Sequence, residues 1–350
     1  MSGETIQGVA AAAFAPGSIG NAGPGFDVLG LAIDGVGDTV SVRLATVGPS
    51  RVESVTGRDA GEVPCDCAAN SAAIAAREYL RRRGIAGEIV IRIDKGLPLS
   101  GGLGGSAASS VAGAFAAHLL ACALDDARNS GETTRADDAG GAKRRADERD
   151  ASPDDDARAL ESDVVADLLA AALAGETAVA GPHLDNIGPS LLGGLVLSRS
   201  VEPIDVVPLT VAAPWWLALW TPQVRVETRA ARAILPAQSD RGLWVRQMAN
   251  TAALVHAFAA GDGALLARAL DDGYAEPLRA PLIPHFHAVK AAAIGAGAFG
   301  GSISGSGPTV FAIAADETTA RGAAAAMQRA GEVGSTIHAG AIARRGARRA

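Results

Sequence analysis

Three glycine-rich segments, far apart in the sequence, contain most of the residues that could perform chemistry. The middle one reads Pro-Leu-Ser-Gly-Gly-Leu-Gly-Gly-Ser-Ala-Ala-Ser-Ser over residues 98–110. Glycine has no side chain, so backbone N–H groups can face a phosphate, and a helix N-terminus carries about half a positive charge. We predict a loop over residues 101–110 and a helix over residues 111–124, which together form an anion-binding site.

Other kinds of glycine-rich loop fit this segment less well. No Gly-Lys-Ser/Thr follows, which excludes a Walker A loop. No acidic residue closes a simple βαβ unit after it, which argues against a dinucleotide-binding fingerprint. A glycine-rich turn by itself is as consistent with a structural role as with ligand binding, but the pattern P-x-x-x-G-L-G-x-S-A-A is more specific.

Composition narrows the classes of function. Of the 350 residues, 48% are hydrophobic and only 4% aromatic, so the core must consist of Ala, Val, Leu and Ile. The net charge of −7 argues against non-specific nucleic-acid binding. Cys65, Cys67 and Cys122 lack the spacing of a zinc site and indicate reduced thiols in a cytoplasmic protein. The apolar residues 9–15 make a poor signal peptide, and no later apolar run predicts a membrane span.

Hydrophobic periodicity predicts the elements that position the glycine-rich segments. The expected strands cover residues 39–44, 88–93, 191–197, 216–220 and 309–314, with the fourth one central in its sheet. The expected helices cover residues 70–83, 160–174, 243–259, 264–270 and 318–330. Residues 300–307 are predicted to be a loop. Strands and helices alternate irregularly, which favours an α+β protein.

Residues 126–158 differ in kind from the rest of the chain. They contain no residue more apolar than alanine and carry a dense mixture of charges of both signs. Such a segment cannot bury enough apolar surface to offset the entropy lost on ordering. We predict a disordered insertion between two helices that acts as a solvated spacer, and a partner-binding segment is the less favoured alternative.

The middle glycine-rich segment resembles the ATP-binding motif of the GHMP kinases, a family that includes galactokinase, homoserine kinase, mevalonate kinase and phosphomevalonate kinase. The resemblance implies an ATP site made of Asn70, Pro98, Ser100, Gly101, Gly102, Leu103, Gly104, Gly105, Ser106, Ala107 and Ser109. The family usually has two serines after Gly-Leu-Gly. Here Gly105 replaces the first serine, and Ser106 keeps the second, which is the position associated with magnesium.

The other two glycine-rich segments resemble the remaining family motifs. Residues 15–27 end in Asn-Ala-Gly-Pro-Gly-Phe-Asp, the form found in homoserine kinases, although Ile19 and Ala22 replace the commoner Ser and Leu. Residues 301–309 resemble the loop that closes over the site beside the substrate and phosphates. All three motifs occur in the family's order across nearly the whole chain, which a chance match does not explain.

The sequence His-Leu-Asp-Asn at residues 183–186 resembles the His-x-Asp-Asn motif of homoserine kinases. The resemblance implies that Glu176 joins Ser106 at Mg²⁺, since oxygen ligands suit this cation. It also implies that Asn186 holds the reacting hydroxyl, with Asp185 as the alternative base. Outside this context, Glu176 would be read as a solvated carboxylate at a helix end.

Two segments with arginines, 228–232 and 276–279, resemble parts of homoserine kinases that bind the amino acid. The resemblance implies a substrate site made of Asn21, Asp27, His183, Asn186, Thr228, Arg232, Arg279, Ser304 and Gly305. It implies a catalytic set made of Asn186, Asp185 and Arg232. An arginine fork suits the α-carboxylate of homoserine, and the carboxylate of Asp27 suits its ammonium group. Alone, His183 would be read as a structural residue and Arg279 as a surface charge.

The resemblance implies the GHMP kinase fold, with an α/β domain similar to a ribosomal-protein domain over residues 1–200 and a ferredoxin-like α+β domain over residues 201–350. It implies that ATP, with Mg²⁺, phosphorylates the hydroxyl of L-homoserine to give O-phospho-L-homoserine on the route to threonine. The net charge and the lack of a long apolar run predict no nucleic-acid or membrane partner, and a homodimer is left open. The alternatives are a GHMP kinase for mevalonate or a sugar, a non-catalytic nucleotide-binding member, and a dinucleotide-dependent oxidoreductase.

Overall fold

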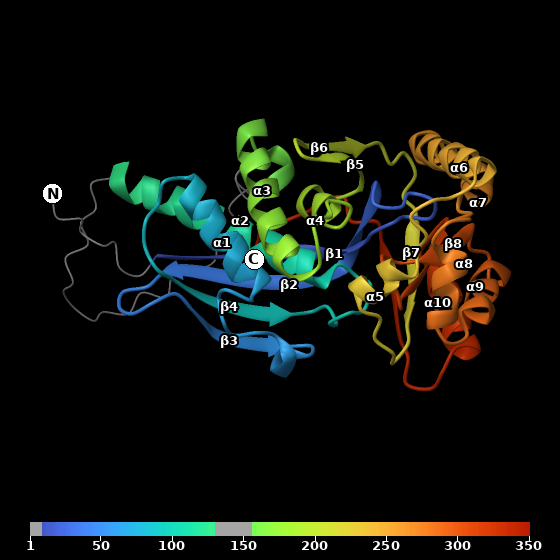
Figure 1. The fold of residues 1–350 in the computed structure, drawn as a ribbon, viewed down its shortest axis with the longest axis horizontal. Helices are drawn as coiled ribbons and strands as arrows, with labels where there is room; N and C mark the ends of the chain where they lie inside the picture. Colours follow the sequence, from blue (N-terminus) through green and yellow to red (C-terminus); the bar gives the residue numbers. More distant parts are fainter. Residues whose placement is uncertain (1–8, 130–155) are drawn as a thin grey trace.

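The computed structural model describes residues 9–129 and 156–350. These residues form two β-sheets at opposite ends of an elongated molecule, each with its own layer of helices (Figure 1). The first sheet has seven strands and the second has four. The mixture of mainly antiparallel sheets with packed helices confirms the predicted α+β class.

The first sheet is built on two long neighbouring strands, β1 (Ala10–Ile19) and β2 (Leu29–Leu44). Its other strands are β3 (Arg51–Gly57), β4 (Ile89–Lys95), β5 (Leu195–Val201), β6 (Ile204–Leu209) and β11 (Arg348–Arg349). The strand order is β11-β1-β2-β4-β3, and β5 pairs with both β2 and β6. β2 therefore has different neighbours at its two ends, β5 near Leu29 and β4 near Leu44.

The second sheet contains β7 (Trp216–Thr221), β8 (Gly300–Ile303), β9 (Val310–Ala314) and β10 (Thr336–Ala341). Its order is β10-β7-β9-β8, so the first strand along the chain lies between the fourth and the third. Helices follow β7 and β9, which gives the β-α-β-β-α-β arrangement of ferredoxin-like domains. The predicted central position of the strand at residues 216–220 is confirmed.

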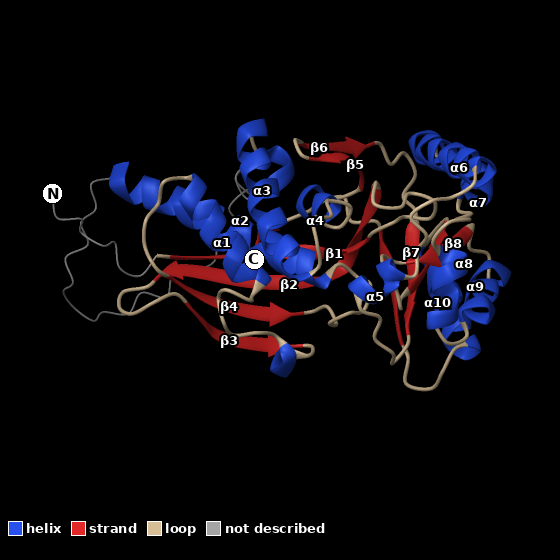
Figure 2. Cartoon of the chain, viewed as in Figure 1, coloured by secondary structure: helices blue, strands red, loops and turns tan. Residues whose placement is uncertain are grey.

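Helices cover the two sheets separately (Figure 2). Those beside the first sheet are α1 (Ser71–Arg82), α2 (Gly105–Asn129), α3 (Ser162–Val179) and α4 (Ile187–Leu192). Those in the second half are α5 (Thr228–Ala233), α6 (Arg241–Ala260), α7 (Gly263–Ala269), α8 (Glu276–Arg279), α9 (Phe286–Gly295) and α10 (Glu317–Ala330). Short 3₁₀ helices span Ala60–Glu62, Ala157–Ala159 and Ala280–Leu282.

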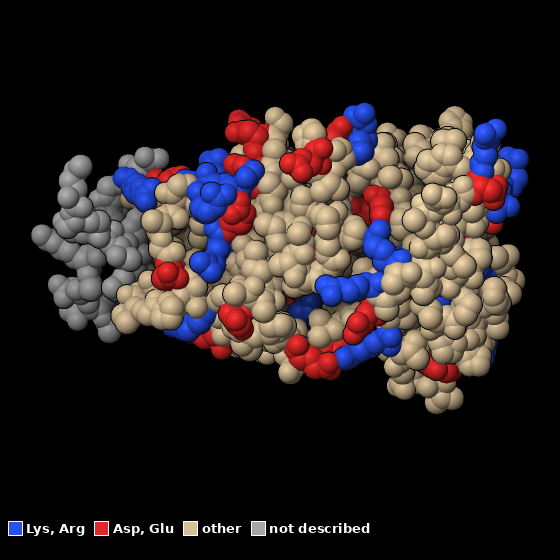
Figure 3. Space-filling view, in the orientation of Figure 1, with Lys and Arg blue, Asp and Glu red and all other residues tan. Residues whose placement is uncertain are grey.

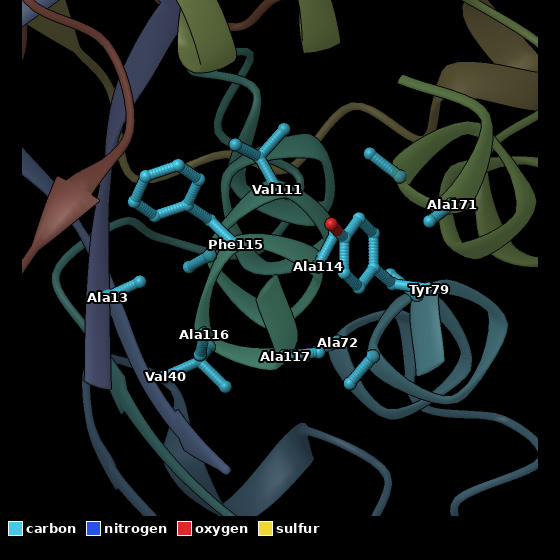
Figure 4. Close-up of a cluster of buried hydrophobic side chains, with 14 of the residues drawn as sticks. Ala13, Val40, Ala72, Tyr79, Val111, Ala114, Phe115, Ala116, Ala117 and Ala171 are labelled. Atoms are coloured by element: carbon cyan, nitrogen blue, oxygen red, sulfur yellow. The ribbon is translucent and has the colours of Figure 1, made fainter. Parts of the chain in front are cut away.

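Helix α2 is the centre of the larger hydrophobic core (Figure 4). Phe115 on this helix lies toward the sheet, and Tyr79 of α1 and Ala171 of α3 lie on the opposite side. Alanines fill much of the space between the three helices, as at Ala114 and Ala117, which lets them approach closely. This packing explains how a chain with so few aromatic residues builds a dense core.

Helix α2 is also the one described helix that is long and apolar enough to cross a membrane, with a mean hydropathy of 1.7 over its most apolar 18 residues, within Gly105–Arg128. Within the structure, 89% of its most apolar window is buried against the sheet and the neighbouring helices. Its apolar character is therefore accounted for by its central position in the core.

Three predicted boundaries were wrong. α2 begins at Gly105 rather than residue 111, because small residues and alanines allow a helix that packs closely from its first turn. Residues 191–192 end helix α4 instead of opening a strand, since a short buried apolar run has no distinguishing period. β8 occupies residues 300–303 of the predicted loop, where a side chain at Gly301 would collide with the Phe311 carbonyl.

The predicted disordered insertion was too wide at both ends. Residues 126–129 continue helix α2. Asp156 forms an isolated β-bridge with Arg348, and Ala157 is fully buried. The C-terminal strand therefore holds the residues that follow the insertion. The rest of the predicted insertion, residues 130–155, lies outside the described residues.

The point along the chain where the first sheet gives way to the second does not lie at residue 200. β6 pairs with β5 of the first sheet, and β11 returns to the edge of the same sheet. We therefore propose a domain boundary between β6 and β7, with the last residues of the chain belonging to the first domain. A prediction that divides the chain at a single residue cannot include the pairing of the C-terminal β11 with β1, because the two strands are far apart in the sequence.

Candidate active site

The middle glycine-rich segment forms a tight loop before helix α2. Gly104 has a left-handed backbone conformation with φ of +65°, and a side chain there would collide with the Ser18 hydroxyl. The helix begins at the next residue, Gly105. The first N–H groups of a helix have no partner inside the helix, so those of Gly105, Ser106 and Ala107 can bind an anion.

The carbonyl groups of this loop are held by the third glycine-rich segment. The Gly101 carbonyl accepts hydrogen bonds from the Thr309 N–H at 3.3 Å and the Thr309 hydroxyl at 2.6 Å. The Ser304 hydroxyl donates to the Gly102 carbonyl at 2.5 Å. In a trans peptide, the N–H of the following residue points the opposite way. The N–H groups of Gly102 and Leu103, which follow these two carbonyls, therefore point away from the third segment.

The first glycine-rich segment contacts both of the others. The Ser18 N–H donates to the Leu103 carbonyl at 3.0 Å, and the Gly305 N–H donates to the Gly20 carbonyl at 2.9 Å. The Asn21 side chain donates to the Gly305 carbonyl at 3.1 Å. The three segments, which are separated by long stretches of chain, thus meet pairwise through hydrogen bonds at the junction of the two sheets.

A buried ion pair lies under the start of helix α2. Asp38 of β2 contacts Lys95 at the end of β4, and their side chains are 0% and 2% exposed. Lys95 also donates to the Gly105 carbonyl at 3.1 Å, and the Leu97 N–H donates to Asp38 at 3.2 Å. The Ser109 hydroxyl lies within 2.9 Å of Lys95 Nζ and 2.6 Å of Asp38 Oδ2. This network fixes both ends of the anion-binding loop.

Glu176 of α3 is buried, and its Oε2 atom has no hydrogen-bond partner among the described residues. Burial raises its pKa to about 7; a hydrogen bond from Ser106 acts in the opposite direction and the Asp185 carboxylate in the same one. An unpartnered buried carboxylate oxygen beside a serine hydroxyl fits a hard cation that keeps other ligands of its own. The residues that the structure describes contain no cluster of three or more His, Cys, Asp or Glu side chains that could hold a metal without such help.

The His-x-Asp-Asn motif lies just before helix α4 and faces the first glycine-rich segment. The buried Asp185 carboxylate accepts a hydrogen bond from the Asn21 N–H at 3.0 Å. Burial raises the pKa of Asp185 to about 7, and the negative charge of Asp27 acts in the same direction. The Ser18 hydroxyl donates to Asn186 Oδ1 at 2.9 Å, so Asn186 is held beside the turn that precedes α2.

Two arginines from the second half of the chain reach the first segment. Arg232 forms a bidentate ion pair with Asp27 at 2.8 and 2.9 Å. Arg279 is 2% exposed and donates to the backbone carbonyls of Gly305 at 2.9 Å and Ala231 at 3.1 Å. Carbonyl oxygens do not neutralise its charge, so the guanidinium group of Arg279 remains able to bind an anion.

The charge of the two arginines affects their neighbours. Burial lowers the pKa of Arg279, and the nearby positive charge of Arg232 lowers it further. Burial and Arg232 also lower the pKa of His183, which favours the neutral imidazole.

Figure 3 shows charged side chains gathered where the two halves of the molecule meet, beside a hollow on this face. The junction combines two guanidinium groups with an anion-binding helix start.

Comparisons with known proteins agree with this arrangement. The chain matches the family models "GHMP kinases N terminal domain" over residues 70–135 and "GHMP kinases C terminal" over residues 254–333. It is 35% identical to a homoserine kinase of Chloroherpeton thalassium over 325 residues, which cover 90% of both chains. It is 34% identical to a homoserine kinase of Chlorobium phaeovibrioides over 328 residues, covering 91% of this chain and 90% of the other.

A crystal structure of homoserine kinase from Cytophaga hutchinsonii superposes with a TM-score of 0.82 at 35% identity and covers 100% of both chains. The chain belongs to the homoserine kinase family of GHMP kinases. The predicted family and fold are thus confirmed.

Within this homoserine kinase fold, the predicted substrate residues lie together. Arg232 pairs with Asp27, Arg279 contacts Gly305, and the Thr228 hydroxyl lies 3.4 Å from the Ser306 hydroxyl. The roles that the family resemblance implies for these residues remain predictions.

The predicted nucleotide residues fall into two groups. The structure places Ser100 to Ala107 on the loop and at the start of α2, together with the metal candidate Ser106. Asn70, however, caps helix α1 by accepting from the Ala73 N–H at 3.1 Å and donates to the Pro64 carbonyl at 2.8 Å. The hydroxyl of Ser109 is likewise used within the protein. Their side chains hold the structure around the site, and contact with ATP is a prediction for them.

Sequence reasoning missed the residues that support the site from below. Asp38 and Lys95 were not singled out, although a charged residue inside an apolar strand pattern is a signal for a buried pair. Asp272 was also missed: its carboxylate accepts from the N–H groups of Ala275 at 3.1 Å and Glu276 at 2.9 Å. It thereby fixes the start of α8, the short helix that carries Arg279.

Proposed function

We propose that this chain is a homoserine kinase that transfers the γ-phosphoryl group of ATP to the hydroxyl of L-homoserine. The observation that carries the proposal is the placement of two arginines and one aspartate beside an anion-binding helix start. Asn186 lies beside the loop that precedes this helix, because a side chain on Gly104 would approach Asn186 Oδ1 to 2.9 Å. The relatives described above, which are named homoserine kinases, support the same substrate.

The charges at the junction match an amino acid better than a sugar. A zwitterionic amino acid needs a cationic group for its carboxylate and an anionic group for its ammonium. Arg279, with backbone carbonyls as partners, supplies the first, and Asp27 supplies the second. Arg232 would then bridge Asp27 and the substrate carboxylate, because its fork has donors for two acceptors. Mevalonate lacks the ammonium group and galactose lacks both charges.

We propose that Ser106 and Glu176 hold Mg²⁺ together with the phosphates of ATP. The unpartnered Oε2 atom of Glu176 supports this assignment. When bound, the cation would supply neutralisation of phosphate charge. The residues of the chain supply position: the helix start binds the phosphates, and Asn186 orients the attacking hydroxyl.

The transfer step needs little chemistry from side chains. The homoserine oxygen forms a bond to the γ-phosphorus, the bond from that phosphorus to the β,γ-bridging oxygen breaks, and ADP leaves. An asparagine cannot accept the hydroxyl proton, so we propose that it passes to an oxygen of the transferred group. Asp185 has a suitable pKa of about 7. Its oxygens, however, face the Asn21 N–H and the Asn186 amide, which supports a positioning role.

We also propose a cytoplasmic enzyme whose partners are small molecules. The three cysteines, all within the described residues, are free thiols, and thiols persist in a reducing compartment. A homodimer remains a prediction that size-exclusion chromatography with light scattering would test.

A coupled assay of ADP release distinguishes the proposed substrate from its rivals. We expect turnover with L-homoserine and background rates with mevalonate and galactose. The variant Glu176→Gln, purified in the same way, shows whether the turnover belongs to this chain, since we expect it to lose most of the activity. A preference for mevalonate or a sugar would overturn the proposal. ATP binding without turnover of any alcohol would favour a non-catalytic member, and NAD binding without ATP binding would favour an oxidoreductase.

A further inference from the structure

Phe26 lies against both arginines of the candidate substrate site. The Arg232 guanidinium carbon lies 5.3 Å from the centre of its ring, and that of Arg279 lies 5.5 Å from it. Tyr274 packs edge-on against the same ring, with centroids 5.2 Å apart and an interplanar angle of 80°. One side chain, half-buried, therefore contacts both cations that would bind the substrate carboxylate.

The two guanidinium groups need such a contact because their charges repel each other. Arg232 lowers the pKa of the buried Arg279, and Asp27 is the one carboxylate that forms an ion pair with either arginine among the described residues. The face of an aromatic ring attracts a cation through its quadrupole and does not compete for hydrogen bonds. A ring can therefore stabilise both guanidinium groups and leave their N–H donors available to a carboxylate.

The ring is itself held in place by its neighbours. The next residue, Asp27, has a left-handed backbone conformation with φ of +56°, and its N–H donates to Asn21 Oδ1 at 2.8 Å. The Tyr274 hydroxyl donates to the Pro236 carbonyl at 3.0 Å, which fixes the ring that packs against Phe26. The aromatic side chain is thus pre-positioned between segments from both halves of the protein.

We propose that Phe26 is a positioning residue for the substrate carboxylate, acting through cation–π contacts with Arg232 and Arg279. The inference rests on the proposed function, since it takes an amino acid as the ligand. A role through cation–π contacts requires an aromatic ring at position 26 and not merely an apolar side chain of similar size. A purely structural Phe26 would tolerate the loss of its π-electron density, whereas a residue that orders the two cations would not.

The test replaces Phe26 with phenylalanines that carry increasing numbers of fluorine atoms, which weaken the ring quadrupole while keeping its shape. We expect the KM for homoserine to rise stepwise, by about tenfold at full fluorination, with the KM for ATP nearly constant. Phe26→Tyr should stay close to the wild type and Phe26→Leu should resemble the fully fluorinated protein. Phe299→Leu, a half-buried ring against Trp215, is the control and should leave the KM for homoserine unchanged.

A substrate without a carboxylate provides the decisive comparison. With 3-aminopropan-1-ol, which is homoserine lacking that group, the fluorinated proteins should match the wild type in kcat/KM. An unchanged KM for homoserine across the fluorine series, or an equal loss with the amino alcohol, would overturn the role of Phe26 and leave the proposed function intact. A wild-type protein that does not phosphorylate homoserine would overturn the proposed function and this inference together.

Discussion

Asp27 and Arg232 form a bidentate ion pair although 205 residues separate them in the sequence. Asp27 lies at the end of the first glycine-rich segment, and Arg232 lies on the short helix α5 after the first strand of the second sheet. The pair therefore joins the two halves of the molecule beside the candidate phosphate site. Its side chains are 34% and 39% exposed, so a ligand can reach both.

Arg232→Lys should weaken the use of homoserine more than the use of ATP. Lysine keeps the positive charge but lacks the planar fork that contacts both oxygens of Asp27. We expect kcat/KM for homoserine to fall by about 100-fold or more, as when one partner of a hydrogen-bonded charge pair is truncated. Steady-state kinetics with each substrate varied separately measure this difference. An equal rise in both KM values would show that the ion pair mainly holds the two halves together.

Glu176→Gln should make the apoprotein more stable while removing activity. The neutral amide avoids burying a charge, and it is a poor ligand for Mg²⁺. We expect a higher melting temperature without ligands at a pH above 7, where Glu176 is otherwise charged, and a kcat lower by about 100-fold or more. Calorimetry and assays over a range of Mg²⁺ concentrations measure the two effects. An unchanged dependence on Mg²⁺ would remove Glu176 from the metal site.

The stability of the ligand-free protein should fall as the pH rises through the range in which Glu176 titrates. Its pKa is raised from 4.5 to about 7, so between these values the folded protein holds a proton that the unfolded chain has released. The free energy of unfolding then decreases with pH, by on the order of 3 kcal/mol once the pH exceeds the folded pKa. Urea unfolding between pH 5 and 8 measures the slope. The same series with Glu176→Gln should have a smaller slope, and identical slopes would contradict the assignment.

Lys95→Met should be strongly destabilising because it leaves the Asp38 carboxylate buried without its partner. Breaking a buried ion pair in this way costs about 3–5 kcal/mol. We expect the surviving folded protein to have a higher KM for ATP, since Lys95 also holds the Gly105 carbonyl. The double change Asp38→Asn with Lys95→Met should recover part of the stability. Urea unfolding of the three variants tests this, and strictly additive losses would show that the two side chains act independently.

Deletion of the charged insertion should be tolerated only within narrow limits. Replacing residues 131–154 by a short Gly/Ser linker should leave the melting temperature and activity close to those of the full chain. Removing residues 126–158 should lower the melting temperature by several degrees, because it also removes buried Ala157 and the ion pair of Asp156 with Arg345 at 2.7 Å. Thermal unfolding of both deletions gives the comparison. Equal melting temperatures would show that Asp156 and Ala157 contribute nothing to stability.

Local pattern was sufficient for most of the elements and for the loop that binds anions. Alternating isoleucines at residues 89, 91 and 93 predicted a strand, and all three are buried in β4. A loop over residues 101–110 before a helix was predicted from glycine content and the helix dipole, and residues 101–104 of it are a loop in the structure. The start of α2 was misplaced because the small residues 105–110 are compatible with either state locally, and packing against the sheet decides between them.

The sequence by itself determined that a glycine-rich turn feeds a helix, and that arginines, an asparagine and two carboxylates with family-like spacing accompany it. These are properties of short segments, whose backbone preferences and charges depend on residues close in the chain. Only the tertiary structure decided that Asp38 supports Lys95, that Ser109 and Asn70 are used inside the protein, and that Phe26 touches two arginines. Such contacts join residues far apart in the chain, so they depend on how whole elements pack and not on any local pattern.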